Sequence, residues 1–262
     1  MLPRRFLLVA AAFGLLVLGA PLETRAEGGG EGTSGATSLA TVPDALMTGL
    51  AQHAERFEQM KRRGEFTMSG RMEEVDSDGH ASDTKEVLLR STPTPAPMDR
   101  ITNVIRFMDN GKDKTADAQK RATERREKRL KDPEKQAEAR KKDIKMPFLA
   151  SEQPRYVFTM AGRDASQPGR VRIAFVPKTT AENAIKGSAW VDESEREVLT
   201  LGFSFSKNPT FVDHVDVQIV FGLATSLGRA PSKASFDGRG GFLFIHKHYR
   251  GSATLSDPRI AF

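Results

Sequence analysis

Apolar and polar residues alternate with a period of two through most of the chain from Gly64 onward. This alternation is typical of strands that bury one face and expose the other. Turn-forming stretches such as "DSDG", residues 76–79, predict short hairpin connections. The pattern therefore predicts about nine strands in an antiparallel meander. The apolar positions are Phe66, Met68, Met72, Ile101, Ile105, Phe107, Tyr156, Phe158, Met160, Val171, Ile173, Phe175, Leu199, Leu201, Phe203, Phe205, Val215, Val217, Ile219, Phe221, Phe242 and Phe244.

A period of three to four residues precedes the strands and predicts a helix over residues 43–63. His53 lies beside the apolar stripe of this helix and is expected to be an ordinary surface histidine. The sequence thus predicts a mainly β (α+β) fold, in which one N-terminal amphipathic helix covers the apolar concave face of a curved antiparallel sheet. The stripe consists of Leu46, Leu50, Ala54 and Phe57.

The N-terminal region predicts export of the chain. Residues 1–26 combine two arginines, the apolar run 6–20 and small residues before Glu27, which is typical of a cleaved secretory signal peptide. An uncleaved membrane anchor is the alternative, although the run is short for a bilayer span. Gly, Ser and Thr dominate residues 27–42, which predicts a flexible linker. The chain has no second such run and no cysteine to carry a lipid, so we expect a mature protein without a transmembrane span, in the periplasm or outside the cell.

A highly charged insert at residues 112–145 interrupts the alternating pattern. It holds 14 Lys and Arg against 8 Asp and Glu, and it has few large apolar residues. We therefore expect a solvated helical arm between two neighbouring strands, with a second helix that begins at Pro133. Such an arm is either an ordinary charged helix or a contact for an anionic component. It has no aromatic residue to stack on a base, so no nucleic acid is expected as a partner. The candidate anion contacts are Lys120, Arg121, Arg125, Arg126, Lys128 and Arg129.

The main candidate for acid–base chemistry is "WVDESERE" at residues 190–197, which contains Asp192, Glu193, Glu195 and Glu197. Glycosidase-type chemistry requires two carboxylates that face one cleft, one of them with a raised pKa. These acids are crowded together and are expected to be open to water. We therefore interpret the stretch as a polar hairpin turn without catalytic function.

Two further motifs also receive structural interpretations. His246 and His248 fall on one face of a predicted strand, but a metal site needs a third ligand, so we expect two partly exposed histidines. "DGRGG", residues 237–241, lacks the phosphate-loop pattern and is expected to form a hairpin turn. We expect no catalytic residue, no cofactor and no metal.

Three stretches carry a recognisable family pattern: "FTMAGRDASQPGRVRIAFVPKT" at 158–179, "KGSAWVDESEREVLTLGFSF" at 186–205 and "YRGSATLSDPRI" at 249–260. The second contains a Gly-x-x-Trp-Val-Asp strand, and the third closes on the Ser-Asp-x-Arg step formed by Ser256, Asp257 and Arg259. Over roughly residues 43–262 the chain resembles the outer-membrane lipoprotein-sorting proteins (LolA/LolB-like). It is most similar to uncharacterised secreted bacterial proteins of that fold.

The resemblance implies a half-barrel, an open and curved antiparallel sheet with helices across its mouth. It also implies an apolar concave cavity that can hold acyl chains. The residues that would line this cavity are Phe66, Met68, Phe158, Phe203, Phe205, Val217, Ile219, Phe221 and Phe242.

These observations leave three functions open. The first is a non-catalytic periplasmic or secreted module that binds an acyl chain or a lipoprotein. The second is an envelope interaction or scaffold protein whose basic arm contacts an anionic partner, and the third is a hydrolase. An apolar pocket of about 300 Å³ or more beneath the helix would favour a ligand, whereas a concavity filled by the helix would favour the interaction protein.

Overall fold

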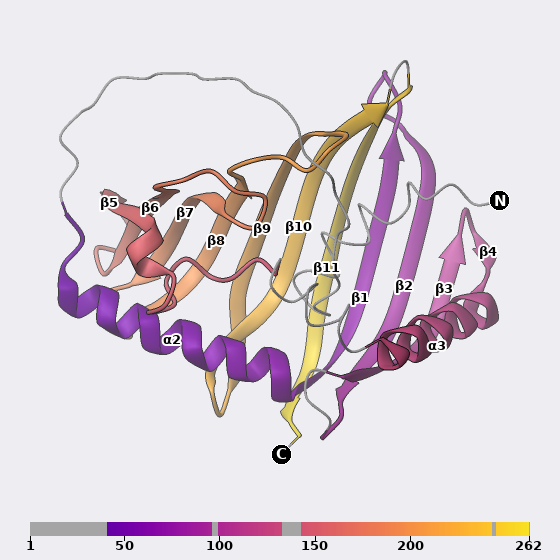
Figure 1. Ribbon diagram of the computed structural model, residues 1–262, viewed down its shortest axis with the longest axis horizontal. Coiled ribbons are helices and arrows are strands. Elements are labelled where there is room, and N and C mark those ends of the chain that lie inside the picture. The colour runs from indigo at the N-terminus through magenta and orange to yellow at the C-terminus, as the bar shows by residue number, and fades with distance from the viewer. Residues whose placement is uncertain (1–40, 96–98, 133–142, 243–244, 262) are drawn as a thin grey trace.

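One large sheet dominates the molecule (Figure 1). The computed structural model describes residues 41–95, 99–132, 143–242 and 245–261. Eleven antiparallel strands follow the order β4–β3–β2–β1–β11–β10–β9–β8–β7–β6–β5. Their bounds are β1 (Gly64–Val75), β2 (Ala81–Pro93), β3 (Arg100–Asp109), β4 (Lys112–Asp113), β5 (Tyr156–Arg163), β6 (Arg170–Pro177), β7 (Ile185–Asp192), β8 (Glu197–Phe205), β9 (Val212–Thr225), β10 (Gly228–Phe242) and β11 (Ile245–Ile260).

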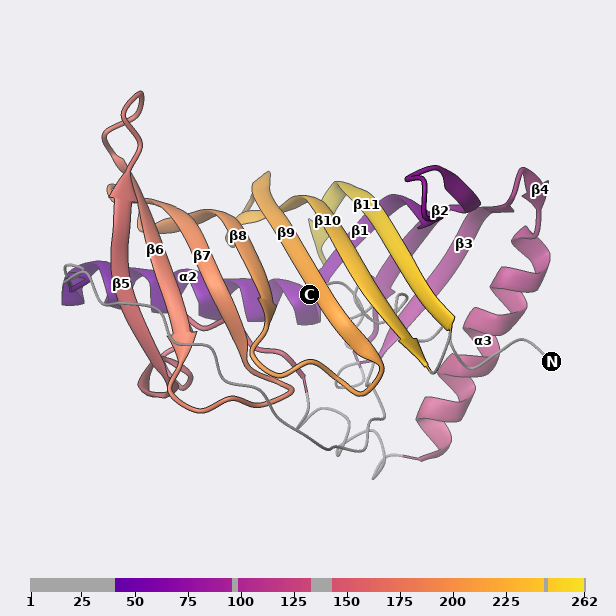
Figure 2. The same ribbon diagram turned by 90° about the horizontal axis from the view of Figure 1, so that it is seen from above.

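Two long helices accompany the sheet. Helix α2 (Asp44–Arg63) runs across one face of the sheet, and α3 (Thr115–Lys131) lies at the edge formed by β3 and β4 (Figures 1 and 2). A short 3₁₀ helix, η2 (Gln153–Arg155), precedes β5. The predicted fold class, a mainly β half-barrel with a helix over its concave face, is confirmed.

The apolar stripe predicted for α2 is buried against the sheet. Leu50 and Ala54 are fully buried, and Leu46 and Phe57 pack in the same core. Val42, which the sequence placed in the flexible linker, also belongs to this core. The expected signal peptide and residues 27–40 of the linker lie outside the described residues, as does the start of the helix expected at Pro133.

The strand order differs from a simple meander at one position. The chain runs from β5 to β11 in sequence order, and β11 then pairs along most of its length with β1. Strands β3–β4 and β5, which flank the charged insert, therefore lie at opposite edges of the sheet. The expectation that the insert joins two neighbouring strands was wrong, because the long β1–β11 pairing separates them.

The face predicted for β3 was wrong for two of its three apolar residues. Ile101 and Ile105 are 47% and 49% exposed, although the alternation placed them in the core. The register between β2 and β3 shifts opposite Leu88 and Leu89, so that Ile105 has no cross-strand partner. One extra residue reverses the alternation, and Val104 pairs with Leu89 on the covered face instead.

The glycine-rich stretch at 237–241 is not a turn but part of β10. Its residues pair with β11, from Asp237 opposite Arg250 to Gly241 opposite His246. At Gly240 a side chain would meet the Phe211 carbonyl oxygen at 2.3 Å, so only glycine allows this close approach of the backbone. The glycines therefore serve strand packing rather than chain reversal.

The charged insert is not a free arm, because α3 covers the outer edge of β3. The Thr115 hydroxyl accepts a hydrogen bond from the Phe107 amide at 2.9 Å, and the Gln119 Oε1 accepts one from the Val104 amide at 2.6 Å. The contacting face consists of small and polar residues at helical spacing, which an apolar pattern does not reveal. Its half-buried members are Thr115, Ala118, Gln119, Ala122, Arg126 and Arg129.

We predict that the double variant Thr115→Val/Gln119→Leu loosens this edge. Each lost acceptor removes a hydrogen bond that contributes about 1 kcal/mol, so the Val104 and Phe107 amides should exchange about fivefold faster with solvent deuterium. Lys120→Met, on the exposed side of the same helix, is the control and should leave the exchange unchanged. Equal exchange in both variants would show that α3 does not protect β3.

Candidate functional site

The concave face of the sheet has a cover made of two segments. One is α2, and the other is the stretch from residue 143 to Gln153, which follows the charged insert. In this second segment Phe148 is fully buried, and its ring stacks on Phe158 at 5.4 Å and meets Phe175 edge to face at 6.0 Å. The Gln153 side-chain amide donates hydrogen bonds to the carbonyl oxygens of Met47 and Phe148, which ties the two segments together.

A pocket of about 50 Å³ remains along the seam between the two covering segments and the strands β7–β9. Its walls are apolar apart from three charged residues. This volume is far below about 300 Å³, the lower end for ligand pockets, so the concavity is almost filled in this conformation. The lining residues are Phe57, Glu58, Lys61, Ile144, Lys145, Met146, Ile185, Leu201, Phe203, Phe205, Val217 and Ile219.

The structure places eight of the nine predicted lining residues, and it divides them among three places. Four of them, Phe203, Phe205, Val217 and Ile219, line the seam pocket. Phe158 and Phe221 pack in the main core, away from the pocket lining. Phe66 and Met68 belong to a separate small cluster with Leu89 and Ala253, and the side chain of Phe242 lies outside the described residues.

Sequence reasoning missed the contribution of the second covering segment. Ile144 and Met146 line the pocket, and Phe148 and Leu149 are buried beside it. The signal was present as the short apolar run "MPFL", residues 146–149, directly after the charged insert. It has neither a helical nor a strand period, because the segment packs as an irregular chain.

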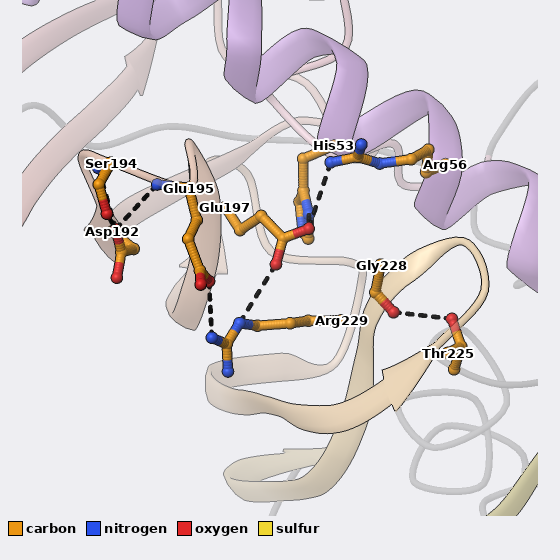
Figure 3. Close-up of polar contacts among 9 residues, drawn as sticks. All are labelled: His53, Arg56, Asp192, Ser194, Glu195, Glu197, Thr225, Gly228 and Arg229. Atoms are coloured by element: carbon orange, nitrogen blue, oxygen red, sulfur yellow. Dashed lines mark hydrogen bonds and ion pairs between the residues drawn. The ribbon is translucent and has the colours of Figure 1, made fainter.

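The stretch "WVDESERE" forms a turn between β7 and β8, as predicted. The Asp192 carboxylate accepts hydrogen bonds from the Ser194 hydroxyl at 2.6 Å and from the Ser194 and Glu195 amides (Figure 3). These hydrogen bonds lower the pKa of Asp192, and the bond from the Ser194 hydroxyl has the largest effect. Asp192 therefore organises the turn as an ionised acceptor, which does not suit it to donate a proton.

Glu197, however, does not lie in the solvent as expected. Its side chain is only 12% exposed, and it lies between the guanidinium groups of Arg56 from α2 and Arg229 from β10, each at 3.2 Å (Figure 3). Glu195 contacts the other side of Arg229 at 2.6 Å. The acids that appear adjacent in sequence thus join the turn to α2 and to the β9–β10 hairpin.

The expectation for His53 was wrong as well. His53 is only 1% exposed, and its ring packs edge to face on the ring of Phe221, with 5.7 Å between the ring centroids. Neither ring nitrogen has a hydrogen-bond partner among the described residues, although Nδ1 lies 3.8 Å from Glu197 Oε1. The pKa of His53 is lowered from 6.5 to about 4. Burial is the main cause, and the positive charges of Arg56 and Arg229 add to it. His53 is therefore neutral at neutral pH.

The remaining histidines contact single carboxylates. His248 Nε2 lies 2.8 Å from Asp237 on the neighbouring strand, and the exposed His246 Nδ1 lies 3.6 Å from Asp213. Neither contact gathers a third ligand within the described ranges. The group of three potential metal ligands found there is Asp76, Asp78 and His80, all exposed in the β1–β2 turn.

The six predicted anion contacts fall on two sides of α3. Lys120, Arg121, Arg125 and Lys128 are exposed. Arg126 instead points to Asp99, a buried carboxylate, and forms an ion pair with it at 2.6 Å. Arg129 is half-buried and also feels the charge of Asp99. Arg126 therefore attaches α3 to the segment directly before β3, and Arg129 lies on the same inner side of the helix.

The comparisons with known proteins concern the fold. The chain is similar to a domain from Vibrio parahaemolyticus assigned to outer membrane lipoprotein sorting (12% identity, 82% of this chain and 92% of that one, TM-score 0.36). It is similar to a LolA superfamily protein from Nitrosomonas europaea (10% identity, 84% and 94%, TM-score 0.34). It is also similar to a protein in the MucA/MucB complex of Pseudomonas aeruginosa (12% identity, 81% and 94%, TM-score 0.23). No family model and no curated protein sequence matches the chain.

The expected resemblance to LolA-like proteins is thus found among solved structures, at about one identical residue in ten. With TM-scores of 0.36 and 0.34, the similarity concerns the fold alone. Within the described part of the chain, neither helix is long and apolar enough to cross a membrane.

We predict that Phe148→Ala lowers the free energy of unfolding by about 3–5 kcal/mol, because it leaves a cavity under the cover. Urea denaturation measures the change. Val157→Ala, at an exposed position of β5, should cost less than about 0.5 kcal/mol and serves as the control. A loss below about 1 kcal/mol for Phe148→Ala would contradict the packed state of the second covering segment.

Proposed function

We propose that the chain is a non-catalytic binding module of the bacterial envelope, located in the periplasm or outside the cell. Its ligand is an acyl chain of a lipid or lipoprotein, which enters between α2 and the concave face of the sheet. The observation that carries this proposal is the apolar seam pocket between the two covering segments and β7–β9.

The construction of the cover supports this proposal. Helix α2 and the segment that contains Phe148 contact the sheet mainly through side chains, whereas the strands are joined by continuous backbone pairing. Moving the cover would therefore break few backbone hydrogen bonds of the sheet. The seam is the place where an apolar chain can insert with the least disturbance of the fold.

The charges beside the pocket suit a ligand with an anionic headgroup. Lys61 belongs to α2 and Lys145 to the other covering segment, so they come to the pocket from its two sides. Lys61 forms an ion pair with Glu58 at 2.9 Å, and Lys145 lies 3.8 Å from Glu152. A phosphate or carboxylate at this position would compete with Glu58 and Glu152 for these two ammonium groups.

The volume of the pocket means that the described conformation is a closed one. A space of about 50 Å³ does not hold an acyl chain, so α2 or the second covering segment must move before binding. The ligand would then replace apolar contacts that the cover makes in the closed form, which offsets part of the free energy that opening costs.

A fluorescent long-chain fatty acid tests the proposal directly. Ile219→Trp fills the pocket from its floor and should weaken binding by about tenfold, equivalent to about 1.4 kcal/mol. Val176→Trp adds the same ring on the opposite face of the sheet, where Val176 is 54% exposed, and should bind like the parent. Thermal melts of both variants verify that they are folded.

Two results would contradict the proposal. One is a parent protein that does not bind the fatty acid at all. The other is an equal loss of binding in both tryptophan variants, since this would place the probe elsewhere than in the seam.

The filled concavity favours a second candidate, an envelope interaction protein that uses α3. The exposed Lys120, Arg121, Arg125 and Lys128 give this helix a basic outer side. Deleting the insert is not a clean test, because α3 protects β3 and its flanking strands lie at opposite edges. Substitution of the four side chains retains the helix and its contacts.

For this candidate we predict that changing Lys120, Arg121, Arg125 and Lys128 to Gln abolishes binding to phosphatidylglycerol vesicles at low salt. The matched control changes four exposed lysines, in the strands or in the loops that follow them, to Gln and removes the same charge. If α3 is the contact, only the first variant loses binding in a vesicle sedimentation assay. Equal loss would mean that net charge alone is responsible. The control positions are Lys178, Lys186, Lys207 and Lys233.

A further inference from the structure

His53 occupies an unusual position for a structural residue. It lies on the covered face of α2, among Leu50, Ala54 and Phe57, where an apolar side chain would pack equally well. Both ring nitrogens are buried without a hydrogen-bond partner among the described residues. Burying unsatisfied polar atoms is unfavourable, so this residue weakens the cover at neutral pH relative to a leucine.

The charged groups that face His53 come from three elements. Arg56 lies one turn further along α2, Glu197 begins β8, and Arg229 lies on β10. Phe221 of β9 covers the ring with an apolar surface. Glu197 is shared between the two guanidinium groups, so its negative charge is already neutralised on both sides.

Helix α2 packs closely against the β7–β8 and β9–β10 turns near His53. A side chain at Gly49 would meet Arg196 Cδ at 2.3 Å, so the β7–β8 turn lies directly on α2. The β9–β10 turn lies near the same part of α2 (Figure 3). In this turn the Thr225 hydroxyl donates a hydrogen bond to the Gly228 carbonyl oxygen. A change of charge at His53 therefore acts where α2 is attached to two separate parts of the sheet.

A protonated imidazole does not suit this environment. The closed structure gives it little solvent, no described acceptor within hydrogen-bonding distance and two guanidinium groups close by, and the nearest carboxylate, Glu197, lies 3.8 Å away. When α2 separates from the sheet, the ring reaches water and its proton is stabilised normally. The open form thus binds a proton more tightly than the closed form, and acid must favour the open form.

We propose that His53 is an acid-sensitive latch, whose protonation releases α2 from the β7–β8 and β9–β10 turns and uncovers the concave face of the sheet. The opening itself does not depend on what the protein binds. Its consequence for an acyl chain rests on the proposed function, since the same movement would open the seam pocket.

The size and sign of the effect follow from the two protonation equilibria. The closed form has the lowered pKa of about 4, and the open form has the ordinary value of 6.5. Stability of the closed form is therefore fully present above pH 6.5 and is lost as the pH falls towards 4. Between pH 7 and pH 5 the equilibrium constant for opening should rise about 20-fold.

Hydrogen–deuterium exchange of the α2 amides at pH 7 and pH 5 tests the latch, after correction for the intrinsic pH dependence of exchange. The parent should lose about 20-fold in protection of these amides at pH 5. His53→Leu should retain its protection at both pH values. His214→Gln, which removes an exposed histidine of β9, should behave like the parent.

The latch is overturned if the parent keeps its α2 protection at pH 5, or if His53→Leu loses protection as the parent does. Should His53→Leu not fold, His53→Gln provides the same comparison with a neutral polar side chain. Fluorescent fatty acid binding at both pH values separates this inference from the proposed function. Opening at pH 5 without binding supports the latch and contradicts the acyl ligand, whereas binding without any change in α2 contradicts the latch.

Discussion

The fold depends on covering the apolar face of an open sheet. In a closed barrel, strands would enclose that face, but this sheet has two edges and a wide concave side. Helix α2 and the segment around Phe148 provide the cover, and together with the sheet they form the main hydrophobic core. Removing either segment would expose this core to water, so the stability of the whole domain depends on the attachment of the cover.

The attachment differs between the two ends of α2. At its C-terminal end the buried Arg100 donates hydrogen bonds to the carbonyl oxygens of Lys61 and Gly64, and it also bonds to Ser91 of β2. The Lys61 carbonyl group lies in the last turn of the helix, where carbonyl groups have no partner within the helix. Near its middle, α2 instead meets the turns through Arg56, Glu197 and the unsatisfied His53. The C-terminal end of α2 is therefore held by hydrogen bonds from Arg100, whereas its middle contains His53, whose charge depends on pH.

The two exposed edges are protected in different ways. At β3 the side chains of α3 bind backbone groups that would otherwise be open to another strand. At the other edge, Thr41 forms an isolated bridge with Thr159 of β5, directly before α2 begins. The charged insert, which resembles a solvated arm in composition, thus has a structural role on its inner side and a basic surface on its outer side.

The sequence by itself determined the elements: a period of two predicted the strands, a period near 3.6 predicted α2, and "DESE" predicted a turn. These features are local, because the alternation of side chains follows from the backbone geometry of each segment. Tertiary structure alone decided that β1 pairs with β11, that a bulge exposes Ile105, and that the small and polar face of α3 covers β3. It also brought His53, Glu197 and Arg229 together from distant parts of the chain. Their burial and charge environment exist only once three separate segments pack, and so no local pattern could reveal them.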